Sequence, residues 1–299
     1  MIERFLEYIE FERRLSPETV RTYRNDLTMF AAFVEQQSGL AFDAGLVRAD
    51  DIRAWVLWLT RSGHGARNIA RKISALRSFW RYALKQGLLT ENPTSKIVTP
   101  KFHKQLPATF REQEVETALS YNDDTNDFQQ VFDSLVVDML YQTGMRRAEI
   151  VSLTLDRITL TGKGGELKVI GKRNKERIIP FGSELAARIE LYLQLRREVQ
   201  PADSQAFLVR ANGKTATTYD VYKAVRQTMQ TSSTQHKLSP HVLRHTFATT
   251  LLNNGADINA VKTLLGHANL NATQIYTHVT FEEKLRAYKQ AHPRTNSDS

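Results

Sequence analysis

Residues 158–179, ITLTGKGGELKVIGKRNKERII, decide how the second half of the chain folds. Three short runs rich in β-branched and aliphatic residues, 158–160, 167–170 and 177–179, are separated by glycine-rich or charged turns. Short runs joined by short turns are typical of antiparallel strands, because parallel strands need long crossover connections. We therefore predict a small antiparallel sheet in this stretch.

Helices are predicted before and after these strands in the sequence. Residues 128–140 place apolar side chains at helical spacing before Gly144, which is a typical residue at a helix end. Upstream, Thr109 and Glu112 have the spacing of a capping box, which predicts a helix start. Further helices are expected at 184–199, 219–229, 241–253, 259–265 and around Tyr276. The region is therefore predicted to be mainly α with a small antiparallel sheet.

The first hundred residues show helical patterns and no strand pattern. One helix is predicted to begin at Ser16-Pro17 and another near Asp50. Apolar residues recur in them at helical spacing: Tyr23, Leu27, Phe30 and Val34, then Ile52, Trp55 and Leu59. We predict a helical domain at 1–96, an extended basic linker at 97–108 and a second domain at 109–299.

One helix of the first domain, residues 66–85, is predicted to have two chemically different faces. A rotation of 100° per residue places apolar side chains on one stripe: Ile69, Ile73, Leu76, Trp80 and Ala83. The opposite face gathers donors suited to DNA phosphates: Arg67, Arg71, Ser74, Ser78, Arg81 and Lys85. An ordinary solvated helix face fits this pattern as well. Lys72 and Arg77 could contact bases, phosphates or neither.

The charge of the chain is concentrated around that helix. Lys and Arg number 41 against 32 Asp and Glu, a net charge of +9, which indicates a polyanionic partner such as nucleic acid. Residues 61–104 alone hold ten basic residues and one acidic residue. The absence of cysteine excludes disulfides, thiolate metal sites and a Cys nucleophile. With no apolar signal segment and no stretch near the ~20 apolar residues of a membrane span, we expect a cytoplasmic protein without membrane contact.

Residues 239–245, SPHVLRH, combine a helix start with two side chains that can bind an anion. Ser239 and Pro240 suit the cap and first helical position, so His241 and Arg244 share one face in the first turns. The positive end of the helix dipole adds attraction for a phosphate. Alternatively, His241 and His245 could be a metal pair or one a core histidine. Because no acidic or thiol ligand nearby completes a zinc set, we expect no metal.

Five segments together resemble the motif series of the tyrosine site-specific recombinases, the phage integrase family. They occur in that family's order: TGMRRAE at 143–149, GKRNKER at 171–177, HVLR at 241–244, LGH at 265–267 and QIYTH at 274–278. Each is weakly specific alone, but five in register after a basic helical domain are highly specific. Within the family the chain is most similar to the XerC/XerD chromosome-dimer resolvases. The resemblance implies a SAM-like core-binding domain and an α+β catalytic domain that form a C-shaped DNA clamp.

The resemblance also implies roles for individual residues. Tyr276 would attack the scissile phosphate and form a 3′-phosphotyrosine. Arg146 and Arg244 would clamp that phosphate, supported by His241 and His267. Two guanidinium groups can neutralise the charge of the transition state without a metal. Since the covalent bond conserves the energy of the phosphodiester, no cofactor is implied.

Lys172 would be the general acid for the departing 5′ oxygen. Arg173 replaces the glycine that usually follows this lysine, so Lys175 stays open as an alternative. Ala148 and Ala268 stand where serine is common in the family. None of these departures removes a catalytic functional group.

The partners implied are double-stranded DNA and a homo- or hetero-tetramer on two DNA sites, in which segment 281–288 docks on a neighbouring subunit. A paralogous recombinase and a DNA translocase are further candidates. Three other functions stay open: a mobile-element integrase, a type IB topoisomerase and a non-catalytic architectural DNA-binding protein. The helical first domain argues against the topoisomerase, and the intact catalytic set argues against the architectural protein.

Overall fold

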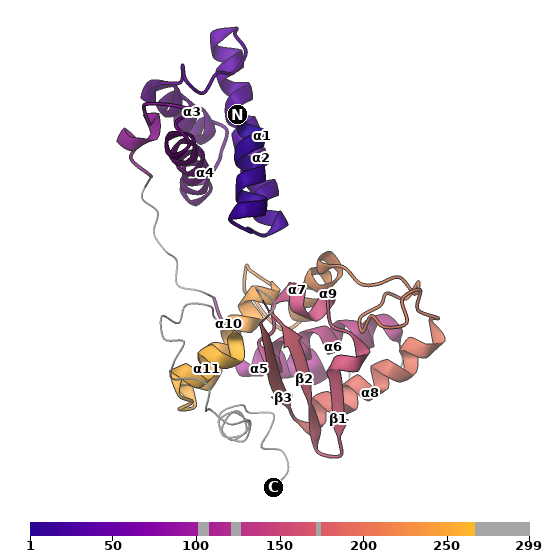
Figure 1. Ribbon diagram of the computed structural model, residues 1–299. Helices are drawn as coiled ribbons and strands as arrows, with labels where there is room; N and C mark the ends of the chain where they lie inside the picture. Colours follow the sequence, from indigo (N-terminus) through magenta and orange to yellow (C-terminus); the bar gives the residue numbers. More distant parts are fainter. Residues whose placement is uncertain (101–107, 121–126, 172–174, 267–299) are drawn as a thin grey trace. The chain divides into compact units, whose positions relative to one another are not determined.

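The computed structural model describes residues 1–299 except 101–107, 121–126, 172–174 and 267–299 (Figure 1). The chain divides into two compact units, Met1–Gln105 and Leu106–Ser299. The described residues of each unit form a hydrophobic core of their own.

The first unit is helical throughout its described elements. They are α1 (Ile2–Glu7), a π-helical turn (Tyr8–Glu12), α2 (Pro17–Ser38), α3 (Ala49–Arg61), α4 (Ala66–Lys85) and a 3₁₀ turn (Pro93–Lys96). The predicted starts of α2 and α3 are confirmed, and the Ser16 hydroxyl accepts a hydrogen bond from the Thr19 amide at 3.3 Å.

Helix α4 buries the stripe that its sequence predicts: Ile69, Ile73, Leu76, Trp80 and Ala83 are all buried. Beside it, the ring of Phe30 packs edge to face on Trp55 at 5.0 Å and on Trp80 at 5.8 Å between centroids. Such aromatic pairs stabilise a core beyond the apolar area that they bury. The apolar side of α4 is thus fixed against α2 and α3, and its basic side faces solvent.

The second unit combines helices with one small sheet. Its helices are α5 (Glu112–Ser120), α6 (Phe128–Thr143), α7 (Arg147–Val151), α8 (Ser183–Glu198), α9 (Thr218–Gln230), α10 (Pro240–Asn253) and α11 (Ile258–Leu265), with a 3₁₀ turn at Leu155–Arg157. The strands β1 (Ile158–Thr161), β2 (Gly164–Ile170) and β3 (Glu176–Phe181) form an antiparallel sheet in the order β1-β2-β3. The predicted fold class is confirmed.

Helix α6 is the centre of this unit and packs against α8, α9 and α10. The sequence predicts an apolar stripe, but 13 of its 16 residues are buried, so the helix is enclosed on nearly all sides. Its buried Asp138 accepts hydrogen bonds from Arg188 of α8 at 3.2 Å and from Gln142 at 2.8 Å. The helix ends at Gly144, which takes the left-handed conformation typical of this position (φ +59°).

The predicted capping box of Thr109 and Glu112 is wrong. Helix α5 begins at Glu112, and it is the Arg111 amide that donates to Glu114 at 2.7 Å. Thr109 instead accepts a hydrogen bond at its backbone oxygen from Gln235 at 2.7 Å. The segment that precedes α5 therefore packs against another part of the second unit. This tertiary contact overrides the capping-box pattern of the local sequence.

Within the described part of the chain, no helix is both long and apolar enough to cross a lipid bilayer.

Candidate active site

The end of α6 positions Arg146. Helix α6 ends at Gly144, and two residues later Arg146 is the N-cap of the short helix α7. Its amide donates to one oxygen of Glu149 at 2.8 Å, and its Nη1 donates to the other at 2.7 Å. The guanidinium is thereby held in one orientation while its side chain stays 34% exposed, enough to meet a ligand.

Helix α10 brings Arg244 to the same place. Its Nη1 donates to the Gly144 carbonyl, and its Nη2 donates to the Leu265 carbonyl at 2.7 Å. Burial, followed by the nearby positive charges of Arg146 and Arg177, lowers the pKa of Arg244 to about 10, although Glu149 opposes this. Arg244 therefore remains a cation at neutral pH.

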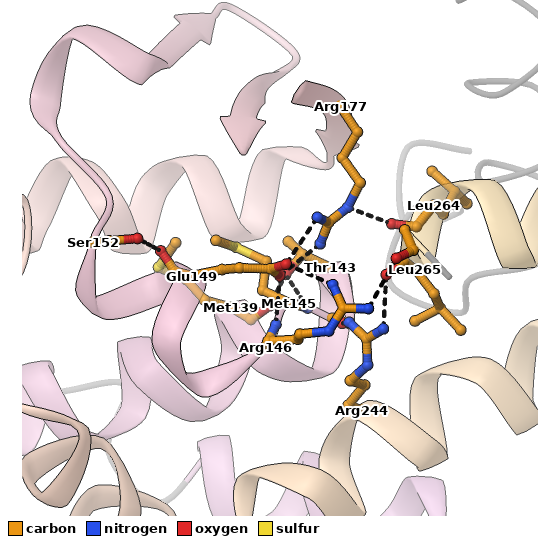
Figure 2. Close-up of polar contacts among 12 residues, drawn as sticks. Met139, Thr143, Met145, Arg146, Glu149, Ser152, Arg177, Arg244, Leu264 and Leu265 are labelled. Carbon is orange, nitrogen blue, oxygen red and sulfur yellow. Dashed lines mark hydrogen bonds and ion pairs between the residues drawn. The ribbon is translucent and has the colours of Figure 1, made fainter. Parts of the chain in front are cut away.

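Two further residues complete this cluster, and sequence reasoning assigned no role to either. Glu149 accepts hydrogen bonds from Arg177 at 3.0 Å to Oε1 and 2.7 Å to Oε2. Burial alone would raise the pKa of Glu149, but the hydrogen bonds from Arg177 and Arg146 outweigh it, so the pKa is lowered. Two guanidinium groups thus donate to one carboxylate and a third, that of Arg244, lies next to Arg146 (Figure 2); these four side chains carry a net charge of +2.

Both residues lie inside the motif segments that carry the family resemblance. The available signal was the acidic residue three positions after Arg146, which fits a capping box, and a charged residue in the third strand. Arg177 is held by a hydrogen bond to the Leu264 carbonyl at the end of α11, which is 87 residues away in the chain.

His241 lies in the first turn of α10, three residues before Arg244, and its side chain is exposed. Lys172, His267 and Tyr276 lie outside the described residues. Lys172 follows Gly171 at the end of β2, where the Gly171 amide donates to the Lys175 carbonyl at 2.8 Å. No group of three His, Asp or Glu residues that could hold a metal ion occurs among the residues with described positions.

The predicted DNA-facing residues of α4 lie mostly in solvent. Arg67, Arg71, Ser74, Arg81 and Lys85 are exposed, and Ser78 is partly buried. Arg71 also forms an ion pair with the buried Asp26, with 3.0 Å between Nη2 and Oδ1.

Lys72 and Arg77 have partners inside the first unit. Lys72 is buried, with its Nζ 2.9 Å from Oδ1 of Asp26, so the possibility that it contacts DNA is not supported. Arg77 donates to the Ile97 carbonyl at 2.6 Å, beside the start of the predicted linker.

Both units match a family model. Residues 2–87 match the phage integrase N-terminal SAM-like domain, and residues 108–283 match the phage integrase family. The chain belongs to this family and is a tyrosine recombinase, a DNA strand-transferring enzyme.

Its relatives include the tyrosine recombinase XerC of Oceanobacillus iheyensis, 38% identical over 99% of this chain and 97% of the relative. The tyrosine recombinase XerD of Listeria monocytogenes is 37% identical over 98% of this chain and 99% of the relative. XerC and XerD match about equally well, so identity does not assign the chain to either.

Solved structures agree on the fold. The XerH site-specific recombinase bound to its difH substrate has a TM-score of 0.69 at 22% identity and covers 96% of this chain and 84% of its own. The integrase of transposon Tn1549, in complex with circular intermediate DNA, has a TM-score of 0.68 at 19% identity and covers 95% and 97%. A site-specific recombinase and a transposon integrase therefore share this fold, so the fold alone does not assign a biological role.

Proposed function

We propose that this chain is a site-specific recombinase that cuts and rejoins DNA through a 3′-phosphotyrosine at Tyr276. The observation that carries the proposal is the convergence of Arg146 and Arg244 at the end of α11, where they donate to the adjacent carbonyls of Gly266 and Leu265. From that point the chain continues to Tyr276 ten residues later.

Arg146 presents donors to a phosphate. A guanidinium has five N–H groups. The hydrogen bonds of Arg146 among the described residues use one on each of two nitrogens. In the proposed complex its other donors bind the non-bridging oxygens beside the cation of Arg244, with His241 on the same face of α10. Fixed donors of this kind stabilise the extra charge of a pentacoordinate transition state.

The proposed reaction balances without an external energy source. The Tyr276 oxygen loses its proton to solvent and bonds to phosphorus while the bond to the 5′ oxygen breaks, and Lys172 supplies the proton that the 5′ oxygen needs. In the second step the 5′-hydroxyl of a partner strand attacks phosphorus and tyrosine leaves. Strand exchange then requires no nucleotide.

The biological role that we propose is chromosome-dimer resolution in the cytoplasm, because the full-length relatives bear the names XerC and XerD. Double-stranded DNA and a tetramer on two sites are the proposed partners, with segment 281–288 docking on a neighbour. A paralogous recombinase and a DNA translocase are part of the same proposal. A mobile-element integrase would use the same chemistry on another site.

A nicked suicide substrate tests the chemistry. Its sequence would come from mapping where the protein protects chromosomal DNA. Denaturing electrophoresis should reveal a covalent protein–DNA adduct with the wild type and none with Tyr276→Phe. An architectural protein would bind the same DNA without any adduct, and a topoisomerase would relax supercoils without exchanging strands between paired sites.

Lys172 can be tested against Lys175 with a 5′-bridging phosphorothiolate, whose sulfur leaving group needs no proton. We expect Lys172→Ala to cleave normal DNA about 10²–10⁴-fold more slowly and to recover on the sulfur substrate. Lys175→Ala should cleave both substrates at rates near that of the wild type. Rescue of Lys175→Ala instead would move the general acid to that residue.

A further inference from the structure

Three arginines hold three successive backbone carbonyls at the end of α11. Arg177 Nε lies 2.7 Å from the Leu264 oxygen, Arg244 Nη2 lies 2.7 Å from the Leu265 oxygen and Arg146 Nη2 lies 2.9 Å from the Gly266 oxygen. The last carbonyls of a helix have no partner within the helix and carry partial negative charge. Cationic donors are therefore well suited to hold them.

Arg177 differs from the other two in its surroundings. Its side chain is only 9% exposed, and both terminal nitrogens donate to Glu149 while Nε donates to the Leu264 carbonyl. A Cβ added to Gly266 would lie only 3.2 Å from Nη1 of Arg177, so the guanidinium packs closely against the helix end. Arg177 is therefore the buried arginine of the cluster, and it joins β3, α7 and α11.

We infer that Arg177 is a positioning residue for strand cleavage. It connects Glu149, the carboxylate that orients Arg146, with the end of α11, and from there the chain continues to Tyr276. This inference rests on the proposed function. It adds a role for a residue that does not touch the substrate.

The physical reason is geometric. Arg146 and Arg244 would hold the phosphate through its oxygens, and the nucleophile must reach the phosphorus from a segment that starts at residue 267. Reactivity depends steeply on the placement of the attacking atom, and a shift of about 1 Å can cost about 10²-fold in rate. Since Glu149 accepts from both Arg177 and Arg146, loss of Arg177 would disturb the phosphate clamp and the helix end together.

A purely structural ion pair between β3 and α7 is the competing explanation. Arg177→Lys separates the two, because lysine keeps the charge beside Glu149 but cannot span a carboxylate and a carbonyl with a planar fork. The buried carboxylate keeps a cationic partner, which limits the loss of stability.

Arg196 offers a matched control in the same unit. It is also buried, and its guanidinium donates to backbone carbonyls of the 203–207 loop, among them those of Ser204 at 3.1 Å and Phe207 at 3.2 Å. Arg196→Lys removes a similar set of guanidinium hydrogen bonds at a position outside the arginine cluster.

The experiment measures adduct formation on the nicked substrate at saturating DNA, together with the dissociation constant for DNA and the midpoint of thermal unfolding. We expect Arg177→Lys to slow adduct formation about 30- to 100-fold while the dissociation constant stays within about 3-fold. Arg196→Lys should lower the midpoint at least as much and keep the rate within about 3-fold.

Three outcomes overturn the inference: an unchanged rate in Arg177→Lys, a loss in DNA affinity alone, or equal slowing in both variants. If Arg177→Lys does not fold, Arg177→Gln, which leaves Glu149 paired with Arg146, replaces it and should show the same split between rate and affinity. A wild type that forms no adduct refutes the proposed function and the inference with it, whereas an active wild type with an equally active Arg177→Lys refutes only the inference.

Discussion

Gly144 allows α6 to end directly beside α10 and α11. Its φ of +59° belongs to the left-handed region, and a Cβ would lie 2.3 Å from a ring carbon of Phe247 and 2.9 Å from a methyl carbon of Leu265. The carbonyl of the same residue accepts the hydrogen bond from Arg244. One glycine thus serves the helix end, the core and the arginine cluster.

We predict that Gly144→Ala lowers the free energy of unfolding by about 2–5 kcal/mol. Overpacking contributes about 1–3 kcal/mol and the left-handed conformation about 1–2 kcal/mol. Urea unfolding of the variant and the wild type measures the difference.

Gly255→Ala is the control in the same unit. Its φ is +83°, yet nothing lies within 4 Å of an added Cβ, so only the conformational cost of about 1–2 kcal/mol should appear. Equal losses at the two positions would contradict the packing argument.

The residues of the cluster differ in how far the sequence predicts them. Arg146 and Arg244 are recognisable because each lies at a helix start within a family motif. Arg177 and Glu149 lie in the same motifs, but their roles depend on α11 approaching β3, and no local pattern encodes that approach. A motif at a helix start therefore identifies Arg146 and Arg244. It does not reveal the role of Arg177, which depends on the Leu264 carbonyl far away in the sequence.

At the scale of elements, α6 shows what periodicity omits. Its stripe predicts the helix and its end, but the three helices packed around it also bury polar positions. Asp133 is one of these: it is 8% exposed and accepts a hydrogen bond from Gln129 at 2.8 Å. Burial raises the pKa of Asp133 to about 6, although Gln129 and Lys223 oppose this.

A raised pKa makes the charged form of Asp133 a cost to folding. The folded state holds the proton more tightly than the unfolded state, whose pKa is 3.8, so stability falls as the pH rises through about 6 and then levels off. Asp133→Asn should therefore be more stable than the wild type by about 1–3 kcal/mol at pH 7.5, with little difference near pH 4.

Urea unfolding at both pH values measures this difference. Asp156→Asn, at an exposed position, is the control and should change stability by less than about 0.5 kcal/mol at either pH. An Asp133→Asn offset that is the same at pH 4 and pH 7.5 would show that packing, and not ionisation, sets the effect.

For the whole molecule, the concentration of basic charge in the sequence overstates how much of it is available to DNA. Asp26 is buried in the first unit and pairs with both Arg71, a predicted phosphate donor, and Lys72, so the charge of these two residues is partly neutralised from within. Burying a cation beside one carboxylate is a tertiary outcome that no count of residues reveals. Arg67, Arg81 and Lys85 keep exposed side chains on α4.

The salt dependence of DNA binding tests this surface. Each phosphate contact that a cation makes releases counterions and adds about 0.9 to the slope of log K against log salt. If the exposed side of α4 lies along the duplex, the double variant Arg67→Ala with Arg81→Ala should reduce that slope by about 2 and weaken binding most at low salt. A second pair, Arg21→Ala with Arg53→Ala, removes the same charge from α2 and α3, where these arginines pair with Glu18 and Asp50. Fluorescence anisotropy over a salt series measures the slope for each variant, and the control should have the slope of the wild type. An equal decrease for both pairs would mean that overall charge, not the face of α4, governs binding.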